Sequence, residues 1–448
     1  MSRPRETPKC GSPPGAEGLS GGFAEYVAHL EDLLVSTSAI EQPERERIEL
    51  ALDGGPGREL RRHYALADLR ASGTFLTGSK LANTLASRAM PSTSRKTIVC
   101  DPACGAGDLL VAMARHLPLT RNLELTLADW GGRLAGFDLQ PLLVRAAKTR
   151  LALLAICRGA RRGSRNGLDL DQLFPHIRVR DGTSSWQLAP GPLCVLLNPP
   201  FTRVTAPPGC RWAAGSVSQA ALFIEACLRQ TVQPLQIHAI LPDVLRTGSR
   251  YERWRRLVSQ TASVADVVRL GLFDRCTDVD VFTARFEIPG GGLACDWGAP
   301  PKTANGTVSD QFEVRVGPVV PYRHHHEGPW LPYAHARGLP RWGRVTDLSE
   351  RIRSNERPFR PPFVLVRRTS RPGDRFRAVG TIVTGKQNVA VENHLLVALP
   401  KDKTLRSCQA LLTVLQHPAS SDWLNQRICC RHLTVSALGE VPWRMADE

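Results

Sequence analysis

An alternation of strand-like and helix-like segments between residues 60 and 290 constrains this chain more than any other feature. Short apolar runs, of which KTIVCD at 96–101 is the first, are separated by segments with apolar residues at helical spacing, such as 141–157. Strands that alternate with helices of ten or more residues form right-handed crossover units and a mostly parallel sheet. We therefore predict an α/β fold with further strands at 133–138, 176–181, 193–198, 236–242, 264–270 and 280–288.

Four of the predicted strands end in a polar residue, namely Asp101, Asp138, Asp181 and Asn198. In an open parallel sheet, ligands bind beyond the carboxyl ends of the strands, near the point where the strand order reverses. Because these ends meet at one edge of the sheet, we expect the four side chains to line a single site.

The first strand runs into a glycine turn and the start of a helix, DPACGAGDLL at 101–110. Gly105 and Gly107 allow the backbone to approach a ligand closely, and a helix N-terminus offers free amide groups. The turn is not a phosphate-binding Walker loop, because no Lys-Ser or Lys-Thr pair follows it. The turn therefore predicts a ligand contact without naming the ligand.

The segment LCVLLNPPFTR at 193–203 joins a strand suited to the middle of a sheet to two prolines. Proline lacks the amide hydrogen that a sheet ladder needs, so the strand has to end at Leu197 or Asn198. The prolines predict a stiff loop that presents one amide side chain and one aromatic ring, Phe201.

Taken in order, these motifs resemble a known series. DPACGAG, GFD, the strand-end Asp181 and NPPF are similar to the motifs of S-adenosylmethionine-dependent methyltransferases that act on exocyclic amines. GTFLTGSKLANTLA at 73–86 resembles the cofactor-binding motif of gamma-class DNA N6-adenine methyltransferases of the restriction-modification type, and 424–443 resembles the closing segment of their recognition domains. The resemblance covers residues 65–290 well and 355–445 more loosely.

The resemblance implies a fold, a cofactor and roles for individual residues. The fold is a Rossmann-like methyltransferase sheet with a small N-terminal helical segment and a C-terminal α+β target-recognition domain. The cofactor is S-adenosyl-L-methionine, with Thr77 at its methionine carboxylate, Asp138 at its ribose hydroxyls and Asp181 at its adenine amino group. The residues implied around the methionine moiety are Asp101, Ala103, Cys104, Gly105 and Gly107.

The chemistry of adenine explains what NPPF would do in such an enzyme. The lone pair of adenine N6 is delocalised into the ring, which makes this nitrogen a poor nucleophile. If Asn198 Oδ1 and the Pro199 carbonyl accept its two hydrogens, the nitrogen moves toward tetrahedral geometry and its lone pair becomes free. Phe201 would stack on a flipped base, with either Phe273 or Phe282 on the other side; we favour Phe273. The implied catalytic residues are Asn198, Pro199, Pro200 and Phe201.

The sequence departs from the family pattern at two places. The family usually has Thr-Pro where this chain has Thr77-Gly78, which predicts a looser turn. An insert, VTAPPGCRWAAGS at 204–216, follows NPPF and is either a lid over the flipped base or a plain surface loop.

The formal net charge of +16 favours a polyanionic partner, and the resemblance implies double-stranded DNA. From Arg351 to Arg377 the chain carries nine arginines against two acidic residues, which predicts a surface that follows phosphates, with a plain solvated face as the alternative. We found no carboxylate-plus-lysine cluster of a nuclease, so any restriction endonuclease would be a separate chain. The candidates for DNA contact are Arg367, Arg368, Arg371 and Lys386.

Composition divides the chain into four parts. We expect a disordered tail and helical segment over 1–60, the catalytic domain over 61–290, a Gly, Pro and Thr-rich linker over 291–328, and the DNA recognition domain over 329–448. No apolar run approaches the roughly 20 residues of a membrane span, and the N-terminus lacks an apolar signal region, so we expect a cytoplasmic protein.

No metal site is expected from the sequence. Cys429-Cys430-Arg431-His432 lacks a second ligand pair at zinc-like spacing, and His324-His325-His326 lies in a Pro and Gly-rich stretch typical of a solvated loop.

The sequence therefore predicts a site-specific DNA methyltransferase that acts on the N6 amine of a flipped adenine, the modification enzyme of a restriction-modification or defence system. The alternatives are an RNA or protein-glutamine methyltransferase of the same NPPF chemistry, and a non-catalytic DNA-binding subunit with a degenerate methyltransferase domain. The intact NPPF segment argues against the last of these.

Overall fold

The structure is a computed structural model that describes residues 19, 21–36, 42–163, 167–230, 235–274, 276–277, 279–288, 297–298, 306–321, 327–429 and 431–443. The chain divides into two compact units. The first comprises the described residues up to Leu245 together with Arg250–Trp297, and the second comprises Arg246–Ser249 and the described residues from Gly298 onward. The change of unit at Gly298 falls within the predicted linker 291–328, of which the structure describes 297–298, 306–321 and 327–328.

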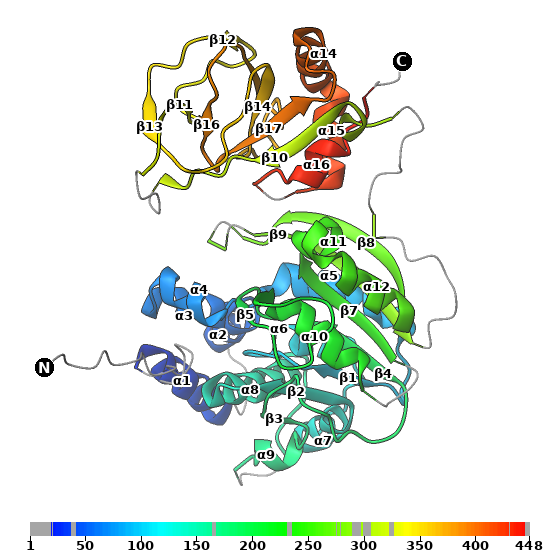
Figure 1. Cartoon of the computed structure of the whole chain (residues 1–448). Coiled ribbons are helices and arrows are strands. Elements are labelled where there is room, and N and C mark those ends of the chain that lie inside the picture. The colour runs from blue at the N-terminus through cyan, green and yellow to red at the C-terminus, as the bar shows by residue number, and fades with distance from the viewer. Residues whose placement is uncertain are drawn as a thin grey trace, which may run out of the picture. The chain divides into compact units, whose positions relative to one another are not determined.

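The first unit is built on a seven-stranded sheet in the order β3-β2-β1-β4-β7-β9-β8 (Figure 1). Strands β1, β2, β3, β4 and β7 run parallel, and β9 lies antiparallel between β7 and β8. This is the predicted Rossmann-like α/β sheet. Its strands are β1 (Ile98–Asp101), β2 (Leu134–Asp138), β3 (Ile177–Val179), β4 (Leu193–Leu197), β7 (Leu235–Pro242), β8 (Ser263–Leu272) and β9 (Asp280–Ile288).

The strand order reverses between β1 and β4, because β2 and β3 extend the sheet on one side and β4 and β7 on the other. Cys100 of β1 pairs with Val195 of β4, so the carboxyl ends of these two strands lie side by side. Asp101 and Asn198 therefore come from the two strands that flank the reversal, which is the position where open α/β sheets bind ligands.

Helices cover both faces of this sheet. Leu193, Val195 and Leu197 of β4 pack into the core on the face of α10 (Gln219–Leu228) and α12 (Glu252–Thr261), whereas Cys194 and Leu196 pack into the core of the opposite face. Burial on both faces explains why the strand reads as a continuous apolar run. The opposite face is covered by α5 (Ser79–Ala89), α6 (Asp108–Ala114), α7 (Leu123–Arg133) and α8 (Pro141–Cys157).

The N-terminal helices belong to the core of the first unit. Phe23, Val27 and Leu60 are at most 1% exposed and pack with Leu143 and Ala146 of α8. A helical segment was expected within 1–60, and the structure has helices both before and after Gly54. The bounds are α1 (Gly22–Ser36), α2 (Gln42–Leu52), α3 (Gly55–His63), α4 (Leu66–Ser72) and the 3₁₀ turn Met90–Ser92.

Smaller elements complete the first unit. The insert after NPPF forms an antiparallel hairpin of β5 (Arg203–Thr205) and β6 (Ser216–Ser218). The remaining elements are α9 (Leu170–Leu173), the 3₁₀ turn Ser249–Tyr251 and, at the boundary between the units, α11 (Asp243–Thr247).

The second unit has the predicted α+β architecture (Figure 1). Its five-stranded sheet, in the order β10-β17-β14-β15-β12, buries Val364 and Val366 against the helices and Phe363 and Leu365 in a second apolar cluster. A three-stranded sheet has the order β13-β11-β16. The elements are α13 (Val308–Gln311), β10 (Phe312–Val316), β11 (Trp330–Ala334), β12 (Arg344–Val345), β13 (Arg351–Arg353), β14 (Phe363–Arg367), β15 (Gly380–Val383), β16 (Ala390–Val391), β17 (Leu395–Pro400), α14 (Leu405–Gln416), α15 (Pro418–Arg427) and α16 (Val435–Gly439).

Within the described part of the chain, no helix has both the length and the apolar character needed to cross a membrane.

Candidate functional site

Asp101 ends β1 and is almost completely buried, with 1% of its surface exposed. Its Oδ1 accepts a hydrogen bond from the backbone N–H of Ala103 at 3.1 Å. Burial raises the pKa of this carboxyl well above its ordinary value, and the neighbouring carboxylates of Asp138 and Asp108 raise it further. Asp101 is therefore a carboxylate held next to like charges with little access to water, an arrangement typical of functional sites.

Asp138 ends β2 and binds the glycine turn. Its Oδ2 accepts the N–H of Gly105 at 3.0 Å, and its Oδ1 accepts the N–H of Gln140 at 2.8 Å. Burial raises the pKa of Asp138, whereas these two backbone donors lower it. The same carboxylate thus fixes the glycine turn and lies at the strand end where a ligand is expected.

The glycines of the turn make room for protein side chains. Gly105 and Gly107 have φ values of +51° and +81°, a region that other residues rarely adopt. A Cβ on Gly105 would lie 2.6 Å from Leu76 Cδ2, and a Cβ on Gly107 would lie 2.9 Å from Ala147 Cβ. We expected these glycines to let the backbone approach a ligand. At these two positions the backbone instead lies close to Leu76 and to Ala147 of α8.

Two further residues assigned to the cofactor belong to the same turn. Cys104 is 4% exposed, and its backbone N–H donates to Phe137 O at 2.9 Å, while its carbonyl accepts the N–H of Gly107 at 2.8 Å. Burial raises the pKa of the Cys104 thiol well above its ordinary value, so the side chain is a neutral thiol that packs in the core. Ala103 is half-buried.

Asp181 lies two residues beyond β3 and is exposed. Its Oδ1 accepts hydrogen bonds from the N–H and the hydroxyl of Thr183, at 2.8 and 2.7 Å. A Cβ on the next residue, Gly182, would lie 1.7 Å from Pro102 O, so this turn lies directly against the glycine turn. The structure therefore brings Asp181 to the same edge of the sheet as Asp101.

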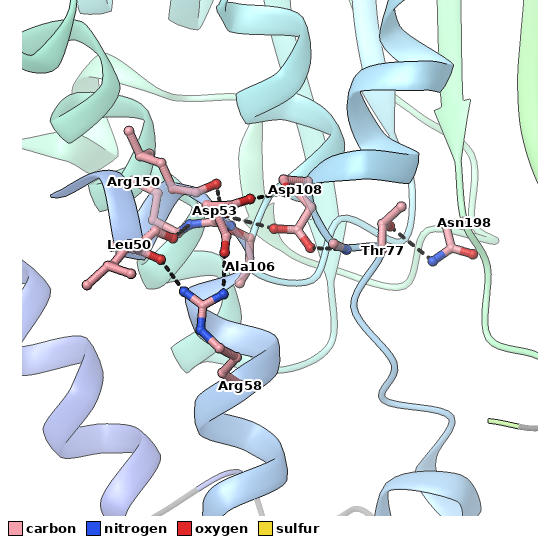
Figure 2. A network of polar contacts seen from close by, with 12 residues as sticks. Leu50, Asp53, Arg58, Thr77, Ala106, Asp108, Arg150 and Asn198 are labelled. Atoms are coloured by element: carbon pink, nitrogen blue, oxygen red, sulfur yellow. Dashed lines mark hydrogen bonds and ion pairs between the residues drawn. The ribbon is translucent and has the colours of Figure 1, made fainter. Parts of the chain in front are cut away.

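Asn198 follows β4 and is 8% exposed. Its Nδ2 donates to Thr77 Oγ1 at 3.0 Å, while its Oδ1 is buried and has no hydrogen-bond partner among the described residues (Figure 2). A buried carbonyl oxygen without a donor is costly, because the oxygen has lost its hydration and gained nothing in return. The side chain is thus arranged as an acceptor for a donor that the protein itself does not supply.

Gly78 is held by a hydrogen bond that proline could not make. Its φ is +71°, and its N–H donates to Asp108 Oδ2 at 2.9 Å. Proline has no N–H and is fixed near φ −65°, so the family's Thr-Pro could not adopt this conformation. The looser turn that we expected from Thr77-Gly78 is instead tied to the first turn of α6.

A buried ion pair that we did not expect from the sequence supports this turn. Asp108 Oδ1 lies 2.9 Å from the NH2 group of Arg150, and Arg150 is 0% exposed. The guanidinium of Arg150 also donates to the carbonyls of Ala51, Ala106 and Leu52 (Figure 2). A signal was available, because Arg150 directly precedes the apolar run 151–156 in the helix 141–157, and charged residues are rarely buried without a partner.

Phe201 and Phe273 lie in contact, with ring centroids 5.3 Å apart and ring planes at 85°. Phe273 directly follows β8 and lies 72 positions after Phe201 in the sequence. The fold nevertheless places it beside the NPPF loop. Phe282 is 0% exposed and packs in the core on the face of α10 and α12. Of the two candidates for the second aromatic, Phe273 is therefore the one beside Phe201.

Leu139 is an apolar residue of this edge that we missed from the sequence. It follows Asp138 directly and is 67% exposed, and Val179, the register partner of Asp138 in β3, is 51% exposed. Large exposed apolar side chains next to a buried carboxylate offer a face for a planar apolar group. The available signal was a leucine placed after the strand-end Asp of GFDL.

The insert 204–216 is anchored and is not a free surface loop. Trp212 is 2% exposed, its Nε1 donates to Glu225 Oε2 at 2.9 Å, and its ring lies 5.9 Å from that of Tyr251. At the base of the hairpin, the Thr202 hydroxyl lies 2.6 Å from Gln219 Oε1. The hairpin thus continues from Phe201 as a folded element of the first unit.

The arginines of the second unit divide into buried and exposed groups. Arg367 donates to Leu339 O at 2.7 Å and Arg368 to Asn393 O at 2.7 Å, and both are half-buried. Arg377 is 0% exposed and donates to Ser370 Oγ and Ile428 O, both at 3.0 Å. The prediction of a phosphate-following surface is therefore wrong for Arg377, whose buried guanidinium forms its hydrogen bonds inside the unit. Arg371 and Lys386 are exposed.

In the part of the chain that the structure describes, no three His, Cys, Asp or Glu side chains lie close enough to hold a metal ion. Cys429 Sγ lies 3.4 Å from Asn425 O, and His432 Nδ1 lies 3.4 Å from Thr369 Oγ1. Cys430 and His324–His326 lie outside the described residues.

The sequence matches no protein-family model and no curated protein. Solved structures with similar folds include a protein described as a class I S-adenosylmethionine-dependent methyltransferase from Listeria monocytogenes, with 16% identity and a TM-score of 0.36, covering 62% of this chain and 91% of that one. Another is described as the modification subunit of a type I restriction enzyme from Vibrio vulnificus, with 15% identity and a TM-score of 0.37, covering 56% of this chain and 51% of that one.

A third similar structure is the type IIL restriction-modification enzyme MmeI in complex with DNA, with 12% identity and a TM-score of 0.45, covering 93% of this chain and 69% of that one. The chain thus spans about half the length of the Vibrio subunit and most of the Listeria protein. At these identities and TM-scores the likeness carries no argument about activity, so the functional argument rests on the residues of this chain.

Proposed function

We propose that this protein is an S-adenosylmethionine-dependent DNA methyltransferase that modifies the N6 amine of a flipped adenine, as the modification enzyme of a restriction-modification or defence system. The observation that carries the proposal is the unpartnered Oδ1 of Asn198, at the end of β4 beside the strand-order reversal. An exocyclic amine is a donor of the kind that this oxygen lacks.

The NPPF loop supplies a second acceptor and a ring. The carbonyl of Pro199 would accept the other hydrogen of the amine, and the two prolines hold both acceptors in place before the substrate arrives. With both hydrogens held, the nitrogen lone pair is drawn out of conjugation with the ring. Phe201 would stack on the base, and because it now touches Phe273 edge to face, the two rings have to part before a base can lie between them.

The residues at the sheet edge fit S-adenosyl-L-methionine. Each oxygen of Asp138 accepts one backbone N–H, which leaves lone pairs for the two hydroxyls of a ribose. Leu139 offers an apolar face to an adenine ring, and the carboxylates of Asp101 and Asp138 favour a cationic ligand. Asp181, Thr77 and the turn from Ala103 to Gly107 are proposed to complete the site. When bound, the cofactor supplies a methyl group on a sulfonium sulfur, which leaves as a thioether.

DNA is proposed as the substrate because the net charge is +16 and a separate α+β unit follows the sheet. In that unit the exposed Arg371 and Lys386 are the candidates for phosphate contact. Arg367 and Arg368 are better explained by their hydrogen bonds to backbone carbonyls.

The test is methyl transfer from labelled S-adenosylmethionine to double-stranded genomic DNA that lacks adenine methylation, followed by digestion to nucleosides. We expect label in N6-methyladenine with the parent protein, and a loss of at least about a hundredfold with Asn198→Ala, because the acceptor that draws out the lone pair is gone. Asn83→Ala is the matched control, since Asn83 is an exposed residue of α5.

Other outcomes separate the alternatives. Label in RNA or in protein glutamine would move the proposal to methyltransferases of the same amide chemistry. Binding of the cofactor without any transfer would favour a DNA-binding subunit whose catalytic unit is inactive. Metal-dependent cleavage of DNA by the purified protein would contradict a modification enzyme with a separately encoded nuclease.

A further inference from the structure

The amide of Asn198 can present either its oxygen or its NH2 group to a substrate, and only the oxygen can accept a hydrogen from an amine. A rotation of 180° about the last side-chain bond exchanges the two groups with almost no change in shape. In the structure the NH2 group donates a hydrogen bond to Thr77 Oγ1 at 3.0 Å, and the oxygen has no hydrogen-bond partner among the described residues. As long as Thr77 Oγ1 acts as the acceptor, this hydrogen bond holds the amide with its oxygen available to a substrate.

We infer that Thr77 is a positioning residue that orients the amide of Asn198, and that the N-terminal helices hold Thr77 in place for this purpose. The inference rests on the proposed function and deepens it. It gives Thr77 a role toward Asn198 in addition to the expected contact with the cofactor, and it gives the N-terminal helical segment a role in the chemistry of the site.

The segment that carries Thr77 is fixed at the two residues that follow it. The N–H of Gly78 donates to Asp108 Oδ2 at 2.9 Å, and the hydroxyl of Ser79 donates to Asp53 Oδ1. Asp53 directly follows α2, and Asp108 begins α6. Two carboxylates from different parts of the sequence thus bind the backbone of Gly78 and the side chain of Ser79, just after Thr77 (Figure 2).

Arginines anchor the Asp108 carboxylate and the backbone at the end of α2. Arg150 of α8 pairs with Asp108 Oδ1 and donates to the carbonyls of Ala51 and Leu52 in α2. Arg58 of α3 donates to the carbonyls of Leu50 and Asp53. Figure 2 shows the resulting chain of contacts from the end of α2 through Arg150 and Asp108 to Thr77 and Asn198.

The Asp108–Arg150 part of this chain of contacts is buried and rigid, whereas Asp53 and Arg58 are exposed. Arg150 is 0% exposed and Asp108 is 7% exposed, so neither can exchange its partner for water without a large cost. A side chain held by such a network is positioned within the small tolerance that a catalytic acceptor needs. The N-terminal helices, which lie outside the parallel sheet, therefore affect the reaction by holding the segment that carries Thr77.

The experiment compares Thr77→Val, Thr77→Ser and the parent in the methyl-transfer assay, with Kd for S-adenosylmethionine measured separately by calorimetry. Valine keeps the shape of threonine but cannot accept a hydrogen bond, so the amide of Asn198 loses its fixed orientation. At saturating S-adenosylmethionine, so that any loss of cofactor affinity does not enter, we expect Thr77→Val to lower kcat about tenfold or more and Thr77→Ser to recover most of kcat. Thr84→Val is the matched control, because the Thr84 hydroxyl donates to Lys80 O within its own helix, α5.

A second readout does not depend on activity. In protein labelled with ¹⁵N-asparagine, of which the chain has nine, the NH2 signals of Asn198 are identified by their absence in Asn198→Ala. We expect these hydrogens to exchange with solvent several times faster in Thr77→Val than in the parent and Thr77→Ser.

The outcomes distinguish this inference from the proposed function. If the parent transfers no methyl group, the proposed function fails, and the exchange rates of the Asn198 NH2 group alone decide whether Thr77 orients it. Equal exchange rates in the parent and Thr77→Val would overturn the inference. So would a kcat that valine leaves unchanged, or a loss in Thr77→Val that appears only in the Kd for the cofactor.

Discussion

Asp101 shows how burial changes the chemistry of a single side chain. A strand-end aspartate in the sequence is an ordinary acid, but here it is 1% exposed with Asp138 and Asp108 as its charged neighbours. The folded state therefore holds a proton on Asp101 at a higher pH than the unfolded chain does. Because the folded state binds more protons in that range, the free energy of unfolding falls as pH rises from the ordinary aspartate pKa of about 3.9 through the raised pKa.

We expect Asp101→Asn to raise the free energy of unfolding at neutral pH by about 1 kcal/mol and to weaken the Kd for S-adenosylmethionine about tenfold or more. Asparagine keeps an oxygen for the N–H of Ala103 and removes the buried like charge, whereas a cationic ligand loses a carboxylate partner. Urea unfolding as a function of pH and calorimetric titration of the cofactor measure the two effects. A variant less stable than the parent at neutral pH would contradict this account of the carboxylate.

At the scale of elements, the hairpin β5–β6 joins the proposed catalytic loop to the helices of one face. It begins two residues after Phe201 and is fastened to α10 through Trp212 and Glu225. The sequence allowed a lid or a plain surface loop at 204–216, and the buried Trp212 favours a fixed element over either. The anchor at Trp212 thus fixes the segment that follows NPPF, and the hydrogen bond from Asn198 to Thr77 fixes the first residue of NPPF.

Replacing the anchor measures how firmly the hairpin is held. We expect Trp212→Ala to lower the free energy of unfolding by about 3 kcal/mol, because the indole packs on Tyr251 with almost no exposure. Trp212→Phe keeps an aromatic ring, loses the hydrogen bond to Glu225 and is expected to cost about 1 kcal/mol. Urea unfolding provides both values. If Trp212→Ala has the stability of the parent, the hairpin is a mobile lid after all.

At the scale of the whole molecule, the net charge of +16 is a poor guide to which arginines are available to the proposed DNA substrate. Arg377 and Arg150 are both 0% exposed and serve the interior of the second and first units respectively. A buried guanidinium that donates to several carbonyls costs a great deal to remove, because its partners lose their hydrogen bonds as well. Only the exposed cations, such as Arg371 and Lys386, are available to a phosphate backbone.

This division gives opposite expectations for two classes of variant. Arg371→Ala and Lys386→Ala should weaken binding to all DNA sequences alike and reduce the slope of log K against log salt by about 1 each, with stability unchanged within about 0.5 kcal/mol. Arg377→Met should instead lower the free energy of unfolding by about 2 to 3 kcal/mol and leave the salt slope as it is. Titrations of DNA at several salt concentrations, paired with urea unfolding, test this; a reduced slope in Arg377→Met would contradict it.

The sequence alone determined the parallel sheet and its polar strand ends. Periodicity places β1, β2, β4, β7 and α8 within one or two residues, because strands buried on both faces and long helices leave a strong local pattern of apolar residues. The Gly, Pro and Asn signals of DPACGAG and NPPF are also local, since they follow from the backbone freedom and hydrogen-bonding groups of those residue types.

Contacts between distant segments were decided only by the tertiary structure. The pairing of Asp108 with Arg150, the hydrogen bond between Thr77 and Asn198, and the contact of Phe201 with Phe273 join residues that are 42, 121 and 72 positions apart. Nothing in a local pattern specifies such partners, because side-chain contacts depend on how elements pack and which atoms lose water. The same packing buries Arg377 and frees the Asn198 oxygen, which are the facts on which the chemistry of this site depends.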